Sequence, residues 1–123
     1  MKAAGIGFRK GADEAALIAA LDAAGGAEGL DALACVADKA QAAPLSGLAA
    51  RLDVPVIPIG ADALTAQNTV TRSSRVEQLY GTGSVAEAAA LAACGPGARL
   101  LGPRSVSPCG KATAAIAVSG DRS

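Results

Sequence analysis

Hydrophobic and polar positions near the start of the chain first follow a strand pattern and then a helix pattern. Ile6 and Phe8 fall on one face of a predicted strand over residues 2–9, and Gly5 and Gly7 fall on the other. Glycine inside a strand marks the close approach of another backbone or of a ligand. A helix is predicted from Asp13-Glu14, whose charges favour a helix start, to about residue 24, with a buried stripe that includes Leu17, Leu21 and Ala24 and an end at Gly25-Gly26.

The same alternation continues to residue 59. Residues 30–36 predict a second strand, which precedes the polar turn Asp38-Lys39. Pro44 suits the first turn of a second helix, whose apolar face carries Leu45, Leu48, Ala49 and Leu52. Residues 54–59 predict a third strand, and two prolines in it indicate an edge strand or a strand end. Alternating strands and helices predict an α/β fold with a largely parallel, helix-covered sheet.

The second half contains the clearest helix, over residues 85–93, between a Gly81-Thr82-Gly83-Ser84 loop and Gly95-Pro96. Residues 61–80 give only short helical pieces around a polar stretch. Residues 98–101 and 113–118 predict two final strands, separated by a loop rich in Gly, Pro and Ser that carries Arg104 and Lys111. We find no repeat or linker and expect a single domain over residues 1–123, with an ordered core at about 2–118 and a loose tail at 119–123.

Composition excludes several classes of chemistry. The chain has no histidine, so Ser-His-Asp and Cys-His nucleophilic systems and histidine metal sites are ruled out. Cys35, Cys94 and Cys109 are too widely spaced for a C-x-x-C motif and too few for a disulfide framework, which favours a reduced, intracellular protein. The first two are expected as small core residues. We therefore expect no bound metal and no redox cofactor.

Acidic and basic residues balance at 11 each, and only 2% of residues are aromatic, so nucleic acid is a poor candidate partner. The balance hides a gradient, because residues 1–66 hold eight acidic and five basic side chains and residues 67–123 hold three and six. The second half is therefore suited to an anion. No run approaches a membrane span, and early charges interrupt a signal peptide, so we expect a cytoplasmic protein without a membrane partner.

Two groups of residues are candidate anion sites, and each also has an ordinary structural explanation. Arg9 and Lys10 follow the first strand beside a helix start, where open α/β sheets collect ligands. The nearby glycines do not fit the dinucleotide motif, and close packing explains them better. Asp38-Lys39 is of interest because it follows the second strand, and its ordinary explanation is a solvated turn pair.

Further along, Ser84 and Glu87 have the spacing of a capping box, while the glycine loop before them can present amides to a carboxylate or phosphate. Both roles are compatible. The loop at residues 71–75 (TRSSR) is either a polar surface turn or an arginine site for carboxylates.

Four segments carry a resemblance to a known family. They are GIGFRKG at residues 5–11, ADK at 37–39, GTGSVAEAAAL at 81–91 and TAAIA at 113–117. In order and spacing, over about residues 2–118, they resemble the CobE/CbiG C-terminal domain family of cobalamin biosynthesis. CbiG proteins carry additional amino-terminal sequence, so the resemblance is to the stand-alone CobE form. The loop at residues 71–74 departs from the family pattern.

The resemblance implies a three-layer α/β/α sandwich with a mostly parallel or mixed sheet. It also implies that the protein binds a polycarboxylate tetrapyrrole, a corrinoid or precorrin intermediate, as a carrier or accessory factor that works with other cobalamin-pathway enzymes. The residues that match the family motifs are the implied ligand-binding residues: Arg9, Lys10, Lys39, Thr82, Gly83, Ser84, Glu87, Lys111 and Thr113.

Two alternatives follow from the same resemblance. One is a hydrolase, with an activity like that of a cobalt-precorrin-5A hydrolase, which opens a ring lactone with loss of a two-carbon fragment. Without histidine, Glu87 or Asp38 would have to act on water or protonate the leaving oxygen. The other is an interaction subunit for a pathway methyltransferase. A composition poor in rings and histidine favours holding a pigment over transforming it.

Overall fold

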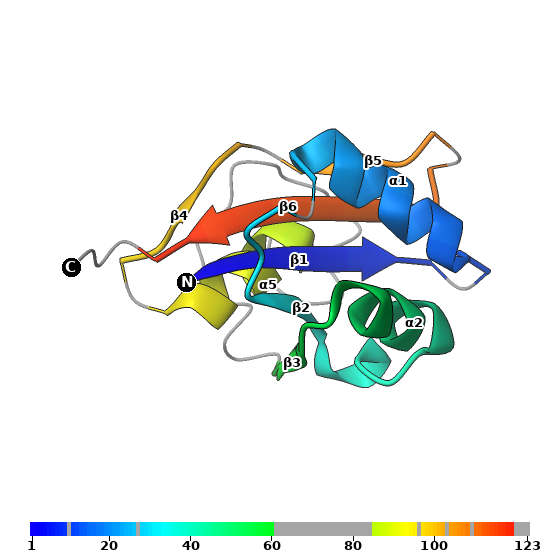
Figure 1. Cartoon of the computed structure of the whole chain (residues 1–123), viewed down its shortest axis with the longest axis horizontal. Helices are drawn as coiled ribbons and strands as arrows, with labels where there is room; N and C mark the ends of the chain where they lie inside the picture. Colours follow the sequence, from blue (N-terminus) through cyan, green and yellow to red (C-terminus); the bar gives the residue numbers. More distant parts are fainter. Residues whose placement is uncertain are drawn as a thin grey trace.

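The protein folds around a six-stranded mixed sheet (Figure 1). The computed structural model describes residues 1–9, 11–26, 28–60, 85–95, 97–102, 104–108 and 110–119. The strands are β1 (Lys2–Phe8), β2 (Ala32–Val36), β3 (Val56–Ile59), β4 (Arg99–Leu100), β5 (Ser105–Val106) and β6 (Ala112–Val118). Their order is β3-β2-β1-β6-β4, with β5 also paired to β6. The first three strands are parallel, and β6 runs antiparallel to β1, β4 and β5.

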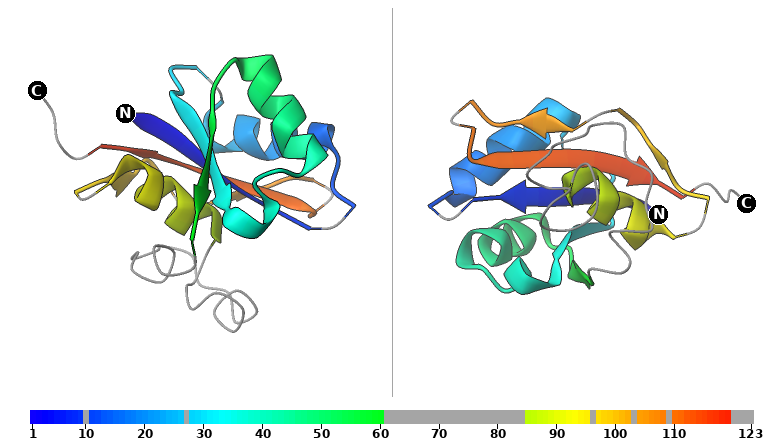
Figure 2. Two further views of the ribbon diagram at one scale, coloured as in Figure 1. Left: turned by 90° about the horizontal axis from the view of Figure 1, so that it is seen from below. Right: turned by 180° about the vertical axis from the view of Figure 1, so that it is seen from behind.

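Helices cover both faces of this sheet. The helices α1 (Glu14–Ala24) and α2 (Ala43–Leu52) pack together on one face, and α5 (Val85–Cys94) lies on the other, against β1, β2 and β6 (Figure 2). The predicted α/β/α layering with a mixed sheet is therefore confirmed. No helix in the described ranges is both long and apolar enough to cross a membrane.

Local signals explain where the first two helices begin and end. The Asp13 carboxylate accepts the Ala16 N–H at 2.9 Å, which caps α1, and Gly25 ends the helix with a φ of 134°. Pro44 lies in the first turn of α2, and Asp53 ends that helix in the left-handed region with a φ of 58°. Because these signals act over one helical turn, the sequence pattern predicted the bounds of both helices closely.

Glycine in β1 allows α5 to approach the sheet closely. A Cβ atom added to Gly5 would lie 1.9 Å from the Ala86 carbonyl oxygen and 2.7 Å from the Ala90 nitrogen, so only glycine fits. Ala86 and Ala90 are themselves almost fully buried. Gly5 therefore lies against the backbone of α5. This confirms the prediction that the glycines of the first strand allow close packing.

The two borders of the described sheet differ from each other. β3 lies at one border, as its prolines indicated, and the Pro58 position pairs with Cys35 of β2. At the other border, β5 forms within the segment predicted as a loop. Ser105 and Val106 pair with β6, and the Ala112 N–H donates to Ser107 Oγ at 3.2 Å. β5 lies among Gly, Pro and Ser residues with no apolar run of its own, whereas the equally short β4 falls within an apolar stretch, so the sequence pattern indicated β4 and missed β5.

Candidate functional site

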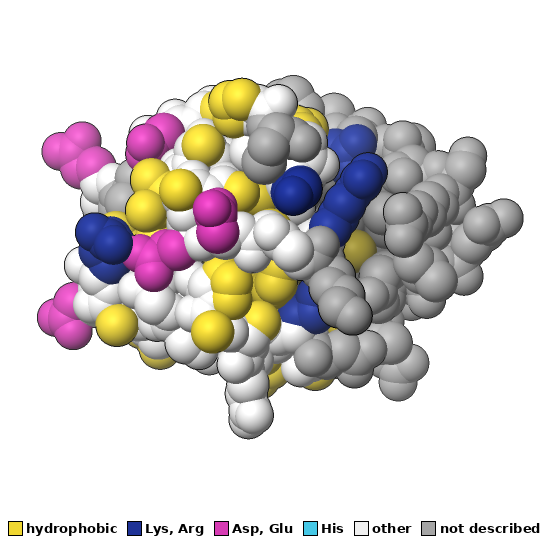
Figure 3. Space-filling view, turned by 90° about the vertical axis from the view of Figure 1, so that its right-hand side faces the viewer, with side chains coloured by type: hydrophobic (Ala, Val, Ile, Leu, Met, Phe, Trp, Pro, Cys, Tyr) yellow, Lys and Arg dark blue, Asp and Glu magenta, His cyan; other side chains and the backbone are white. Residues whose placement is uncertain are grey.

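Three basic residues come together at one end of the sheet. Arg9 follows β1, Lys39 ends the short 3₁₀ helix η1 (Ala37–Lys39) after β2, and Lys111 precedes β6. The Arg9 N–H donates to the Lys111 carbonyl oxygen at 2.8 Å, so the backbones of these two residues are adjacent. We call Arg9, Lys39 and Lys111 the cationic end. Figure 3 faces this end and shows Lys and Arg side chains gathered near its centre, with Asp and Glu side chains to one side.

Lys39 is held in place by β1. Its Nζ donates to the Phe8 carbonyl oxygen, and the ammonium lies 5.3 Å from the centroid of the Phe8 ring. A cation over an aromatic face is stabilised by the ring's quadrupole. An ammonium has three N–H donors, and one of them is used here. Lys39 is therefore a fixed charge, and the described residues leave it donors for a further acceptor.

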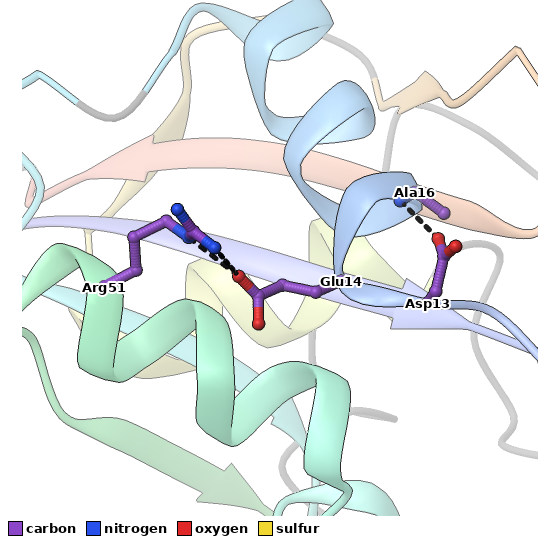
Figure 4. Close-up of polar contacts among 4 residues, drawn as sticks. All are labelled: Asp13, Glu14, Ala16 and Arg51. Carbon is purple, nitrogen blue, oxygen red and sulfur yellow. Dashed lines mark hydrogen bonds and ion pairs between the residues drawn. The ribbon is translucent and has the colours of Figure 1, made fainter.

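Arg9 and Lys111 are exposed, and no ion pair engages either side chain within the described part of the chain. Among the described residues, the ion pair joins helix α1 to helix α2. Arg51 Nη2 of α2 lies 2.6 Å from Glu14 Oε2 of α1 (Figure 4). The acidic side chain of that pair is thus already neutralised. Arg9 and Lys111 keep their charges for solvent or for an anion.

The amino terminus of α5 points toward the same end. A Cβ atom on Gly7, next to the last residue of β1, would lie 3.9 Å from the Ala86 nitrogen and 4.0 Å from Val85 Cβ. From there the helix runs back along β1 toward Gly5. Helix amino termini carry partial positive charge and unpaired N–H groups, so they favour anions. The helix end therefore lies at the same end as the three basic side chains, and the acidic Glu87 in its first turn offsets part of its positive charge.

Two predicted ligand-binding residues make internal contacts. Thr113 Oγ1 donates to the Gly7 carbonyl oxygen at 3.3 Å, on the face of the sheet that α5 covers. Glu87 is fully buried, and its Oε2 accepts the backbone N–H of Arg104 at 2.8 Å. The capping-box spacing did not indicate the second contact, because Arg104 lies 17 residues away in the sequence. Both residues hold neighbouring strands or loops beside the cationic end.

The remaining candidates lie wholly or partly outside the described residues. These are Lys10, Thr82, Gly83, Ser84, the loop at residues 71–75 and the side chain of Asp38. The backbone of Asp38 belongs to η1, so this residue is at the same end as Lys39. The structure thus brings together Arg9, Lys39 and Lys111, which the sequence places more than 100 residues apart at its extremes.

The comparisons with known proteins agree with the resemblance seen in the sequence. A family model described as "Cobalamin synthesis G C-terminus" matches residues 3–117. The chain belongs to this family. It is therefore a cobalamin-biosynthesis protein of the CobE/CbiG type.

Two solved structures of this family resemble the chain over nearly its whole length. One is CobE, described as a protein from the cobalamin (vitamin B12) biosynthetic pathway. It is 33% identical, with a TM-score of 0.81, over 95% of this chain and 92% of that chain. The other is the cobalamin biosynthesis protein chiG from Agrobacterium tumefaciens strain C58. It is 36% identical, with a TM-score of 0.71, over 98% of this chain and 100% of that one. No curated protein sequence matches.

The two thiols described in this CobE/CbiG-type protein are structural. Cys35 is buried in β2, and burial raises its pKa to about 11 even though the nearby Lys39 charge acts in the opposite direction. Burial also raises the pKa of the Cys94 thiol, whose Sγ donates to the Ala117 carbonyl oxygen at 3.4 Å. Thiols with raised pKa values are poor nucleophiles at neutral pH. Among the described residues, no three acidic or thiol side chains cluster in a way that could hold a metal ion.

Proposed function

We propose that this cytoplasmic protein binds a polycarboxylate tetrapyrrole intermediate of corrin synthesis at the cationic end, as a carrier or accessory factor. The observation that carries the proposal is the convergence of Arg9, Lys39 and Lys111 with the amino terminus of α5. A corrin ring has carboxylates around its rim. Lysine, arginine and helix amides are the groups that bind carboxylates most strongly in proteins.

The spacing of the charges supports a large ligand over a small one. The three basic residues come from three neighbouring strands, because they follow β1, follow β2 and precede β6, so together they can meet separate groups of one wide ligand. A single phosphate or acetate needs its donors within one hydrogen-bond shell. A ring with carboxylates on several sides can make one contact with each cation. The free energies of these contacts together stabilise the complex.

A second candidate function is hydrolysis of a ring lactone with loss of a two-carbon fragment. The observation that favours it is the position of Asp38, a carboxylate residue next to Lys39 at the same end of the sheet. Glu87 is a weaker candidate for the acid or base, because its carboxylate is fully buried and one of its oxygens binds the Arg104 amide. Asp38 is therefore our candidate catalytic residue for this activity.

The test is a titration of the protein with dicyanocobyrinic acid, a corrin with free carboxylates, followed by visible absorbance and co-elution. We expect binding that weakens as salt is added, and no binding of the methyl-esterified corrin, because esterification removes the charges. Equal binding of acid and ester would overturn a carboxylate-directed site. No binding of either form would overturn the proposed function.

Two further measurements separate the alternatives. Incubation with a lactone-bearing precorrin, followed by mass spectrometry, detects the loss of a two-carbon fragment, and an Asp38→Asn variant that binds without this loss would assign the chemistry. An unchanged mass in the presence of demonstrated binding leaves the carrier function. Co-purification with a pathway methyltransferase in the absence of pigment favours an interaction subunit.

A further inference from the structure

The edge strand beside β6 contains an irregularity that no sequence pattern indicated. Arg99 of β4 pairs with Val118, and Ser105 of β5 pairs with Ala114. The edge segment advances by six residues between these pairs, while β6 advances by four. Two extra residues therefore lie between β4 and β5. Bulges of this kind bend an edge strand, redirect side chains and occur next to active sites.

Glu87 accepts the backbone N–H that follows this irregularity. Its Oε2 lies 2.8 Å from the Arg104 nitrogen, and the whole side chain is inaccessible to solvent. A buried amide without an acceptor is costly, and a carboxylate is a strong acceptor for one. The contact also joins the first turn of α5 to the edge of the sheet. The place of Arg104 is therefore determined by α5 as well as by the strand ladder.

This contact holds the Arg104 backbone beside the first turn of α5, whose amino terminus points toward the cationic end. The first residue of α5, Val85, lies beside Gly7 near the end of β1. Glu87 is two residues further along, which is about 3 Å of helix rise. Arg104 is partly exposed, and within the described ranges no ion pair or hydrogen bond engages its guanidinium. The Arg104 backbone is thus held beside the first turn of α5, and the described residues supply no ion-pair partner for its guanidinium.

We infer that Arg104 is a further ligand-binding residue of this site and that Glu87 is the residue that positions it. This inference rests on the proposed function and extends it to one more carboxylate of the ligand. Arg104 supplies a guanidinium, which binds a carboxylate through two parallel hydrogen bonds. Glu87 does not touch the ligand. It holds the Arg104 backbone against α5, which fixes the direction from which the guanidinium leaves the strand.

The binding test compares three variants with dicyanocobyrinic acid as the probe. Arg104→Ala is expected to weaken binding by about tenfold, because it removes one charge-assisted contact. The matched control is Arg99→Ala, which removes the same charge from the same edge at the opposite end of the sheet and is expected to leave binding within about twofold of wild type. Arg104→Lys is expected to recover only part of the affinity, since lysine cannot form the bidentate contact.

The positioning role of Glu87 has its own test. Glu87→Gln keeps an oxygen acceptor for the Arg104 amide and is expected to retain binding. Glu87→Ala is expected to lose as much affinity as Arg104→Ala, with no additional loss in the double variant, because the two residues act as one unit. An additive double variant would overturn the positioning role. Should Glu87→Ala unfold, Arg104→Ala still decides whether Arg104 binds the ligand, and lost binding in a folded Glu87→Gln variant would contradict a role for Glu87 as acceptor of the Arg104 amide.

The possible failures can be told apart. If the wild-type protein does not bind the probe, the proposed function fails and this inference fails with it. If the wild-type protein binds and Arg104→Ala binds equally well, only this inference fails. Loss of affinity in both Arg104→Ala and Arg99→Ala to the same extent would show that net charge, and not a contact at Arg104, governs binding.

Discussion

The basic residues at the two ends of β1 make different contacts. At the amino end of β1, Lys2 is bound within the fold. Its backbone N–H donates to Asp31 Oδ2 at 2.8 Å, and its Nζ donates to the Glu28 carbonyl oxygen at 2.9 Å. At the carboxyl end, Arg9 and Lys111 have exposed side chains that no ion pair engages in the described part of the chain. One end uses its lysine for stability, and the other keeps its charges available.

Lys39 is held by contacts within the fold, as Lys2 is, but it belongs to the cationic end. Its ammonium is anchored by the Phe8 carbonyl and ring. The anchoring oxygen belongs to the last residue of β1, directly before Arg9. An anion bound by Lys39 would therefore also lie close to Arg9. A backbone oxygen leaves the net charge of a cation in place, so the Phe8 carbonyl fixes the Lys39 ammonium without neutralising it.

The largest expected effect is a loss of stability from a change in the middle of β1. Gly5→Ala places a methyl group 1.9 Å from the Ala86 oxygen and should lower the free energy of unfolding by about 3 kcal/mol, because two backbones must separate. Because β1 connects the two ends of the sheet, we expect this change to disturb the structure at both. Urea denaturation measures the loss. The control is Gly60→Ala, whose Cβ meets nothing within 4 Å, and equal stability of the two variants would contradict close packing of α5 on β1.

The next effect is a loss of stability at high pH, which comes from the buried Cys35 thiol in β2. The pKa of Cys35 is about 11 in the folded protein, against 9.0 for a free thiol. Between these values the unfolded chain loses the proton and the folded chain keeps it, so stability falls as the pH rises from about 9 to 11. The loss is expected to approach 2–3 kcal/mol. Denaturation of wild type and Cys35→Ala across this range measures it. Identical pH profiles would show that the thiol is not desolvated.

A smaller effect is expected on binding from the exposed cations. Arg9→Ala together with Lys111→Ala should weaken binding of dicyanocobyrinic acid by about tenfold or more, because two rim contacts are lost. Stability should change by less than about 0.5 kcal/mol, since both side chains are exposed. The matched control is Arg51→Ala with Arg99→Ala, which has the same net charge. If that control binds as weakly, the comparison between the two ends is wrong.

The smallest effect is expected at the amino end. Asp31→Ala removes the acceptor of the Lys2 backbone N–H and should cost about 1 kcal/mol of stability, because the contact is exposed. Binding should remain unchanged. Thermal unfolding and the corrin titration, performed on the same sample, check both statements. If Asp31→Ala lowers the affinity for the corrin without lowering stability, the ligand binds at the amino end of β1, and the proposed site is wrong.

The elements whose signals are local were the ones that the sequence predicted well. Asp13 and Gly25 mark the ends of α1, and the alanine-rich run after the glycine loop marks α5. The strand β5 was missed because the residues around it are mostly Gly, Pro and Ser, so only its pairing with β6 reveals it. The role of Glu87 was also missed in part. Its spacing from Ser84 indicates a cap, but its contact with Arg104 depends on how the edge strand bends.

Residue types and short-range spacing were enough to establish an α/β chain without histidine chemistry and a family with cationic residues at strand ends. They also placed Arg9 and Lys39 each after a strand, where open α/β sheets collect ligands. Tertiary structure alone decided that Lys111 joins them, because β6 inserts antiparallel beside β1 and so begins where β1 ends. It also decided that Arg104 lies beside α5. Both outcomes depend on contacts between distant segments, and no local pattern records such contacts.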